Sequence, residues 1–251
     1  MNEIENKSQR TVTILRVFFG LVFLFGIQLM AGKLGWAIAD FFSCETVDPD
    51  GVFVPLSIHH LILMEIALAI ILIMRIGIQA DFGFQWGDRK MGFRYFLLFT
   101  ATIAVIAMGY HALLRALGQP ISYDYPLTTR NILGTLGFQL FLTGTSEEIL
   151  YRALPVTLII FAFGKSVSIS KHVTWEVVLA SFLFTAAHIH WTISPFSISE
   201  LNIFGLVYAF AMGILNGVVY QKTRSILYPM LMHSVSNVIM VGSGYLFALL
   251  I

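Results

Sequence analysis

The sequence is poor in charge and in cysteine. Only 12% of its 251 residues are Asp, Glu, Lys or Arg, against about 25% in an ordinary soluble domain, and 57% are hydrophobic. The net charge is +1 and the basic residues are scattered, so no basic patch predicts nucleic acid as a partner. The single cysteine, Cys44, excludes an intramolecular disulfide and a cysteine-based metal cage. These shortages predict an integral membrane protein.

No internal repeat, low-complexity tract or soluble-domain linker interrupts the chain. A transmembrane helix needs about 20 apolar residues. Stretches that fit this requirement are residues 12–32, 57–74, 95–114, 131–163, 177–193, 201–219 and 226–250. We therefore expect an all-α fold, a polytopic transmembrane helical bundle that forms a single membrane domain over residues 1–251.

The stretch 131–163 is too long for a simple crossing. As one helix it would run about 48 Å, whereas the hydrocarbon core of a bilayer is about 30 Å thick. It must tilt, kink, project from the membrane or consist of two helices, and Pro155 is the expected place for a kink or an end. Seven spans are predicted, with eight as the alternative.

Lysine and arginine fall unevenly between alternate loops, and they concentrate on the cytoplasmic side of membrane proteins. With the N-terminus inside, the opposite side holds only Lys33, Arg115 and Arg130. The cytoplasmic segments hold Lys7, Arg10, Arg16, Arg75, Arg89, Lys90, Arg94, Lys165, Lys171, Lys222 and Arg224. We expect a multi-pass protein of the cytoplasmic (plasma) membrane with a cytoplasmic N-terminus, in contact with the lipid bilayer.

Two adjacent glutamates and an arginine stand inside an apolar stretch, in "EEILYR". On a helix, Glu148 and Arg152 are four residues apart and lie on one face, so they can neutralise each other. Glu147 is offset by about 100° and points along a neighbouring face. It is expected to be the unpaired acid, suited to exchange protons with a substrate or water.

Histidines and an asparagine form two further polar groups in apolar stretches. His233 and Asn237 are four residues apart and could together donate hydrogen bonds to one substrate oxygen, as in an oxyanion hole. His188 could contact a water or a metal near Glu147. One glutamate and two histidines from three helices also suit zinc with an open position.

Each group also has an ordinary structural interpretation. "TSEE" fits a capping box, with Thr145 capping a helix and Glu148 reaching back. His188 could lie at the interface beside Trp191, and His233 with Asn237 could join helices. Ionisable residues within a membrane are nevertheless functional by default, and three groups together favour function.

The remaining polar residues suggest no chemistry. His59 and His60 are expected at the membrane interface, and Glu65 is unexplained. His111 and His172 are expected to be structural or solvated. Gly213 and Gly217 in "GILNG" predict close helix packing.

The three groups resemble the motifs of the CAAX-protease and bacteriocin-processing family of intramembrane proteases, which includes the type II prenyl endopeptidases. "EEILYR" resembles the first motif, "FTAAH", Phe184 to His188, the second, and "HSVSN", His233 to Asn237, the third. The resemblance covers roughly residues 131–240, the expected catalytic core, whereas residues 1–130 are expected to be accessory spans. Ala153 departs from the glycine common in the family, and His190 has no assigned role.

The resemblance implies an intramembrane endopeptidase. Glu147 would activate a water together with His188, His233 and Asn237 would stabilise the oxyanion, and Glu148 with Arg152 would hold the first motif in place. A membrane-associated protein or peptide would be the substrate, in CAAX processing or in peptide or bacteriocin maturation. Both a metal-free glutamate mechanism and a zinc mechanism, with Glu147, His188 and His233 as candidate ligands, are compatible with the motifs, and a tightly held zinc is the less favoured.

Two other functions remain open from the sequence. Glutamate, histidine and arginine inside spans also make the proton relays of transporters and channels. The inverted repeats common in transporters are absent from this sequence. A non-catalytic scaffold or immunity protein with the same fold would tolerate the loss of Glu147.

Overall fold

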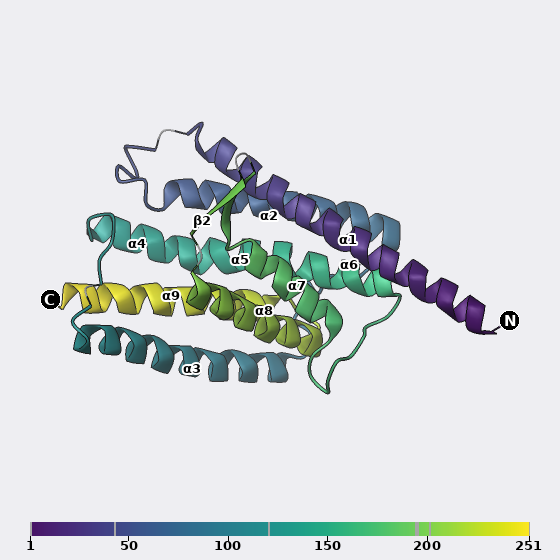
Figure 1. Ribbon diagram of the computed structural model, residues 1–251. Helices are drawn as coiled ribbons and strands as arrows, with labels where there is room; N and C mark the ends of the chain where they lie inside the picture. The colour runs from purple at the N-terminus through teal and green to yellow at the C-terminus, as the bar shows by residue number, and fades with distance from the viewer. Residues whose placement is uncertain (1, 43, 120, 194–195, 201, 251) are drawn as a thin grey trace.

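The computed structural model describes residues 2–42, 44–119, 121–193, 196–200 and 202–250. Helices lie side by side in a bundle, and the two ends of the chain lie at opposite ends of it (Figure 1). The elements are α1 (Asn2–Ala39), α2 (Val54–Ile78), α3 (Arg89–Ala116), α4 (Thr129–Phe138), η1 (Gln139–Thr143), α5 (Gly144–Glu148), η2 (Ile149–Ala153), α6 (Leu154–Phe163), α7 (Trp175–Ala186), β1 (His190–Ile193), β2 (Phe196–Glu200), α8 (Ile203–Thr223) and α9 (Leu227–Leu249). The predicted all-α membrane bundle is confirmed.

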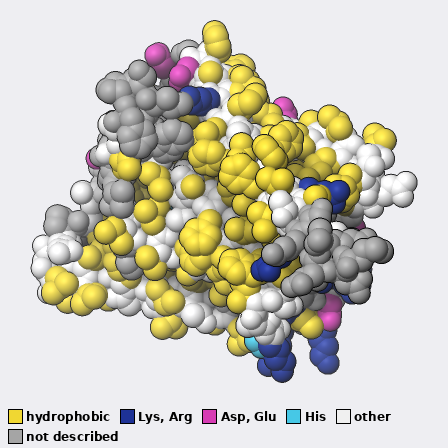
Figure 2. Space-filling model, turned by 45° about the vertical axis from the view of Figure 1, so that its right-hand side comes forward, with side chains coloured by type: hydrophobic (Ala, Val, Ile, Leu, Met, Phe, Trp, Pro, Cys, Tyr) yellow, Lys and Arg dark blue, Asp and Glu magenta, His cyan; other side chains and the backbone are white. Residues whose placement is uncertain are grey.

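The outer surface of the bundle is largely hydrophobic, as a membrane requires. Figure 2 shows hydrophobic side chains across the middle of one face, with lysine and arginine gathered mainly toward its lower right. Among the described residues, Gln9–Ala39 within α1 and the whole of α2, α3 and α9 are each long and apolar enough to cross a membrane. Which end of the bundle faces the cytoplasm stays a prediction.

Three pairs of helices make the main contacts of the bundle: α1 with α2, α3 with α9, and α7 with α8. The predicted glycine packing lies between α7 and α8. A Cβ atom at Gly213 would come within 2.8 Å of Ser181, and one at Gly217 within 2.7 Å of Val177. These glycines therefore let the two helices approach closely, as small residues do in membrane bundles.

The long stretch 131–163 is a single helical run from Thr129 to Phe163. The elements α4, η1, α5, η2 and α6 follow one another without a break, so the eight-span alternative is wrong in the described part of the chain. Pro155 lies in the first turn of α6 and does not end the run. The two five-residue π-helical segments, η1 and η2, are the irregularities that the sequence analysis missed.

The predicted span 177–193 is wrong at its C-terminal end. Helix α7 stops at Ala186, and a turn leads into the antiparallel hairpin of β1 and β2. The physical signal is present in the sequence, because "HIHWTI", residues 188–193, alternates polar and apolar residues with the period of a strand. Length and hydrophobicity alone conceal this alternation.

Candidate active site

The glutamate pair lies between two π-helical segments. η1 ends just before α5, α5 ends with Glu148, and η2 begins at the next residue. Short π segments inside α-helices are rare and often occur at functional sites. Here they change the angular positions of the side chains before and after the acidic pair. The 100° spacing of an ideal α-helix therefore does not hold across this stretch.

Side chains bind two backbone carbonyls of η2. Pro155 has no N–H to donate to the carbonyl of Tyr151, four residues earlier. Arg152 donates from Nη1 to this oxygen at 3.0 Å. Gln28 of α1 donates from Nε2 to the carbonyl of Leu150 at 3.5 Å. The interrupted helix is thus satisfied by protein groups, as backbone at membrane depth requires.

Glu148 is fully buried and surrounded by partners. Its Oε2 lies 3.5 Å from Nε of Arg152, the pairing expected from the sequence. Its Oε1 accepts a hydrogen bond from Asn216 Nδ2 at 3.0 Å and lies 2.8 Å from Nδ1 of His233. Arg152, also fully buried, holds its guanidinium carbon 4.2 Å from the ring centre of Phe184. Glu148 is therefore a structural anchor between α5, α8 and α9.

The capping-box interpretation of "TSEE" is wrong. Thr145 lies inside the helical run, and its hydroxyl donates to the carbonyl of Phe141 at 2.9 Å. Glu148 faces Arg152 and His233 instead of a helix start. No helix begins at this point, because α4 and η1 precede α5 without a break.

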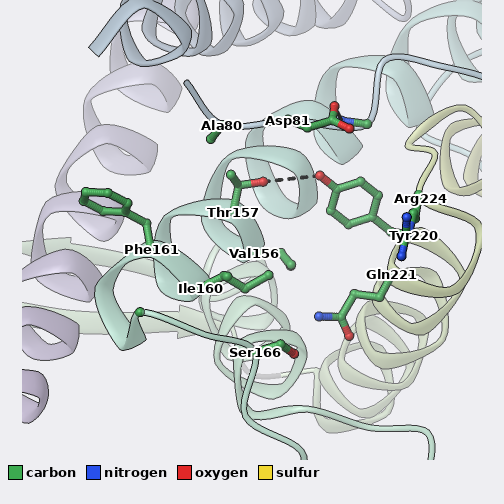
Figure 3. Close-up of a pocket in the computed structure, with 12 residues that line it drawn as sticks. Ala80, Asp81, Val156, Thr157, Ile160, Phe161, Ser166, Tyr220, Gln221 and Arg224 are labelled. Atoms are coloured by element: carbon green, nitrogen blue, oxygen red, sulfur yellow. Dashed lines mark hydrogen bonds between the residues drawn. The ribbon is translucent and has the colours of Figure 1, made fainter. Parts of the chain in front are cut away.

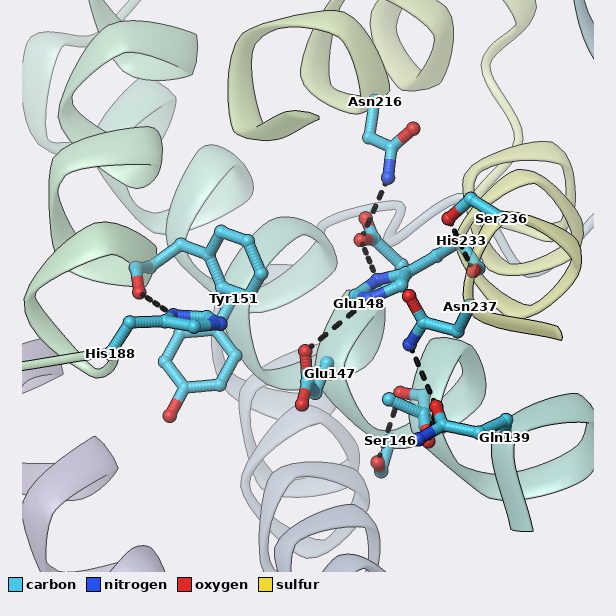
Figure 4. Close-up of polar contacts among 12 residues, drawn as sticks. Gln139, Ser146, Glu147, Glu148, Tyr151, His188, Asn216, His233, Ser236 and Asn237 are labelled. Atoms are coloured by element: carbon cyan, nitrogen blue, oxygen red, sulfur yellow. Dashed lines mark hydrogen bonds and ion pairs between the residues drawn. The ribbon is translucent and has the colours of Figure 1, made fainter. Parts of the chain in front are cut away.

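Glu147 lies on a different face and keeps part of its carboxylate accessible. Its side chain is 16% exposed. Oε2 lies 3.5 Å from His233 Nε2, and Oε1 lies 3.9 Å from His60 Nε2. In the view of Figure 4, Glu147 lies between His188 on one side and His233 on the other. The two glutamates therefore differ in surroundings, one enclosed by partners and one facing histidines.

His60 is the residue that the sequence analysis missed. It was expected at the membrane interface, but it is buried and reaches the glutamate pair from α2. Its Nδ1 lies 2.8 Å from the hydroxyl of Ser146. His59 is also buried and stacks on Trp36 at a ring distance of 4.5 Å, so the interfacial expectation is wrong for both histidines. Their periodicity within α2, with Leu63 and Ala67 on the same buried side, was the available signal.

His188 lies in the turn just after α7, and its side chain is exposed. Its Nδ1 is 2.9 Å from the carbonyl of Phe184, and its ring meets the Phe184 ring edge to face at 4.6 Å. Figure 4 shows His188 beside Tyr151, on the far side of Glu147 from His233. Phe184 therefore contacts both Arg152 and His188, a role for the first residue of "FTAAH".

Asn237 reaches the same region from α9. Its Nδ2 donates to Oε1 of Gln139, in η1, at 2.9 Å. A carboxamide carries two N–H donors, so this bond orients the group and leaves one donor for another acceptor. Gln139 and Asn216 are two further polar residues of the region that motif spacing did not reveal.

Comparison with known families bears directly on this geometry. Residues 129–239 match the family model described as Type II CAAX prenyl endopeptidase Rce1-like. This segment is similar to Rce1-like domains. The matched segment runs from the start of α4 into α9 and contains all three motifs, whereas α1, α2 and α3 lie outside the match. Neither a search of curated proteins nor a search of solved structures gives a match.

At the level of the family, the match supports a CAAX-type protease. The metal ligand set suggested by the sequence was Glu147, His188 and His233. Among the residues that the structure describes, no three or more His, Cys, Asp or Glu side chains are arranged to hold a metal ion. Whether the protein uses a metal stays a prediction.

The other polar residues of the sequence analysis lie away from Glu147 or outside the described side chains. Glu65 is exposed on the outer side of α2. His111 is buried and contacts Ser243 through Nδ1 at 3.0 Å, and His172 is exposed. His190 belongs to β1, and its side chain is outside the described part of the structure.

A cavity lies nearer the end of the bundle where α6 and α8 stop. It has a volume of about 790 Å³, and its lining includes Val156, Ile160 and Arg224. Figure 3 shows Thr157 and Tyr220 within it, joined by a hydrogen bond of 3.3 Å. None of the residues of the three motifs lines this cavity, so it is separate from the glutamate site.

Proposed function

We propose that this protein is an intramembrane endopeptidase that hydrolyses a peptide bond of a membrane-associated protein or peptide, with Glu147 as the general base. The observation that carries the proposal is the division between the two glutamates. Glu148 is enclosed by Arg152, Asn216 and His233, whereas Glu147 is partly exposed and faces imidazole nitrogens. A catalytic base must be free to receive a proton, and only Glu147 meets this condition.

The proposed first step is the attack of water on the scissile carbonyl carbon. Glu147 takes one proton from the water as the new C–O bond forms, and the carbonyl oxygen becomes an oxyanion. His188, whose Nδ1 is held by the Phe184 carbonyl, presents Nε2 to the water. The free amide hydrogen of Asn237 donates to the oxyanion, together with Nε2 of His233 in its imidazolium form, which Glu148 stabilises.

The second step breaks the C–N bond. The protonated Glu147 returns its proton to the leaving nitrogen, which departs as an amine, and the carboxylate is regenerated. No step needs a group beyond water and the side chains of the chain. Arg152 and Glu148 take no proton in this scheme. They hold α5 and α9 in their relative positions through the contact of Glu148 with His233.

The family description supports a proposal for the substrate class. We propose a membrane-associated substrate with a C-terminal CAAX sequence, and a membrane peptide undergoing maturation as the alternative. Two internally quenched probe peptides are compared: one ends in a farnesylated CAAX sequence, and the other is the same peptide without the farnesyl group. A prenyl-dependent enzyme should cleave only the first, whereas a general membrane peptidase should cleave both.

The test uses purified protein in proteoliposomes and mass spectrometry of the peptide ends. Wild type is expected to cleave at least one probe, and Glu147→Gln to show no cleavage at matched protein levels. Glu65→Gln is the matched control, because it removes an exposed carboxylate from the outer side of α2, and it should cleave normally. Full activity in Glu147→Gln would overturn the proposal, and proton flux abolished by this variant would favour a transporter.

A further inference from the structure

We propose that His60 is a positioning residue for Glu147. Ser146 holds His60 in one tautomer, so that His60 Nε2 can accept a hydrogen bond from the Glu147 carboxyl group once this group has taken a proton from the attacking water. This inference rests on the proposed function and deepens it. His60 comes from α2, outside the segment that matches the Rce1-like family. The family match therefore does not identify it, and the contact geometry does.

The hydroxyl of Ser146 decides which nitrogen of His60 carries the hydrogen. Ser146 Oγ lies 2.8 Å from the carbonyl of Leu142 and 3.3 Å from that of Thr143. Carbonyls only accept, so the single hydroxyl hydrogen is directed to the helix backbone. Ser146 Oγ then accepts from His60 Nδ1, 2.8 Å away. His60 is expected as the Nδ1–H tautomer, with a free lone pair on Nε2.

Packing prevents the His60 ring from turning. The side chain is buried and meets Phe138 edge to face at 4.9 Å. The ring of His59 meets it in the same manner at 5.4 Å. Rotation by half a turn would break the Ser146 bond and place a C–H group against it. The lone pair of Nε2 therefore stays directed at Glu147, whose Oε1 is 3.9 Å away.

The two histidines of the family motifs are held in the same way as His60, through their Nδ1 atoms. His233 has its Nδ1 at Glu148, and His188 has its Nδ1 at the Phe184 carbonyl. Fixing one imidazole nitrogen by a hydrogen bond sets the chemistry available at the other. Glu147 thus has a fixed imidazole near each oxygen, His60 at Oε1 and His233 at Oε2.

His60 acts after the first proton transfer, when its Nε2 can accept a hydrogen bond from protonated Glu147. When Glu147 takes the proton of water it becomes a carboxylic acid, and that O–H needs a hydrogen-bond acceptor. Nε2 of His60 is such an acceptor, and a shift of less than about 1 Å brings the 3.9 Å separation within hydrogen-bond range. His60 therefore stabilises the intermediate without contacting the substrate, so its loss should lower kcat and leave KM nearly unchanged.

The kinetic test compares His60→Phe with His59→Phe, which changes the neighbouring ring but not the contact with Ser146. His60→Phe keeps an aromatic ring against Phe138 and should lower kcat roughly 10- to 100-fold, the usual effect of losing a supporting partner. The KM of His60→Phe should change less than about threefold. The control His59→Phe should keep kcat within about threefold of wild type, since it leaves the contact between His60 and Ser146 in place.

A double-mutant cycle separates positioning from general destabilisation. Ser146→Ala should lower kcat by about tenfold, because His60 loses the partner that fixes its tautomer. In the His60→Phe background the same change should have no further effect, since Ser146 acts through His60. Additive losses, or wild-type kcat in His60→Phe, would overturn the inference while the inactivity of Glu147→Gln would still support the proposed function.

A measurement without catalysis completes the test. Histidine ring ¹⁵N spectra of the full chain in nanodiscs should contain a protonated Nδ1 signal that disappears in His60→Phe. The Nε2 signal of that ring should move in Glu147→Gln and stay in place in Glu65→Gln. A protonated Nε2 on His60, or no response to Glu147→Gln, would overturn the inference even if no probe peptide is cleaved.

Discussion

Glu148 and His233 are joined by a hydrogen bond of 2.8 Å between Oε1 and Nδ1, although they belong to different helices, α5 and α9. The bond requires the two helices to approach closely. Gly144 makes this approach possible, because a Cβ atom there would lie 2.5 Å from the carbonyl oxygen of Met230 and 2.5 Å from the hydroxyl of Ser234. The backbone contact at Gly144 and the polar contact at Glu148 therefore depend on each other.

Gly144→Ala is expected to destabilise the protein and abolish cleavage. The added methyl group meets backbone, which cannot move aside as a flexible side chain can, and overpacking of this type costs about 1–3 kcal/mol or more. Thermal unfolding in detergent and cleavage of the probe peptide measure the two effects. Gly137→Ala is the matched control, because a methyl group at Gly137 would meet no atom within 4 Å. Equal behaviour of the two variants would contradict the packing argument.

Arg152→Ala is expected to lower protein yield more than it lowers the specific activity of the surviving fraction. The change leaves Glu148 buried without its charge partner, a loss of about 3–5 kcal/mol. It also removes the donor to the Tyr151 carbonyl, which Pro155 cannot replace. Unfolding midpoints of Arg152→Ala and of Arg94→Ala, an exposed arginine on α3, provide the comparison. A midpoint for Arg152→Ala equal to that of wild type would refute the pairing.

Gln139→Leu is expected to reduce kcat about fivefold while the protein remains folded, because a lost hydrogen bond of this type is worth about 1 kcal/mol. Gln139 holds one amide hydrogen of Asn237, so its loss lets the carboxamide turn away from the oxyanion. Steady-state kinetics should show the effect in kcat. Gln119→Leu, in the loop after α3, repeats the chemical change at an exposed position and should be neutral. An unchanged kcat in Gln139→Leu would remove Asn237 from the mechanism.

Chelators are expected to leave cleavage intact. The described His, Cys, Asp and Glu side chains form no group of three or more arranged for a metal ion, and the proposed steps use Glu147 as the base. Activity is compared before and after incubation with 1,10-phenanthroline, with the metal content of the purified protein measured in parallel. Loss of activity that zinc restores would contradict the metal-free mechanism.

The sequence predicted the helical membrane bundle and the partner of Glu148 because both depend on local features. Hydrophobic length indicates a span, and spacing by four residues sets the pairing of Glu148 with Arg152. The position of His60 depends on α2 lying against α5, a contact between residues far apart in the chain. A single sequence holds no direct signal for such a contact, and His60 was therefore assigned to the interface.

The two π segments could not be predicted for a different reason. An extra residue in a helical turn costs little and leaves no clear compositional mark, so Gln139 to Thr143 reads as ordinary apolar helix. The end of α7 was predictable in principle, since residues 188–193 alternate with a period of two. The strongly apolar character of residues 177–187 outweighed this alternation in the assignment of a span.

The short length of α7 has a consequence for the supply of water to the reaction. At 1.5 Å per residue its 12 residues extend about 18 Å, well short of a hydrocarbon layer of about 30 Å, and the chain continues as a turn and a hairpin. Irregular backbone at this depth has to line a wet space or be covered by protein. A bilayer also thins beside a short element. We therefore expect water to reach Glu147 from the side of the bundle next to His188. Hydration of the lipids on that side should limit how fast the site is resupplied with water.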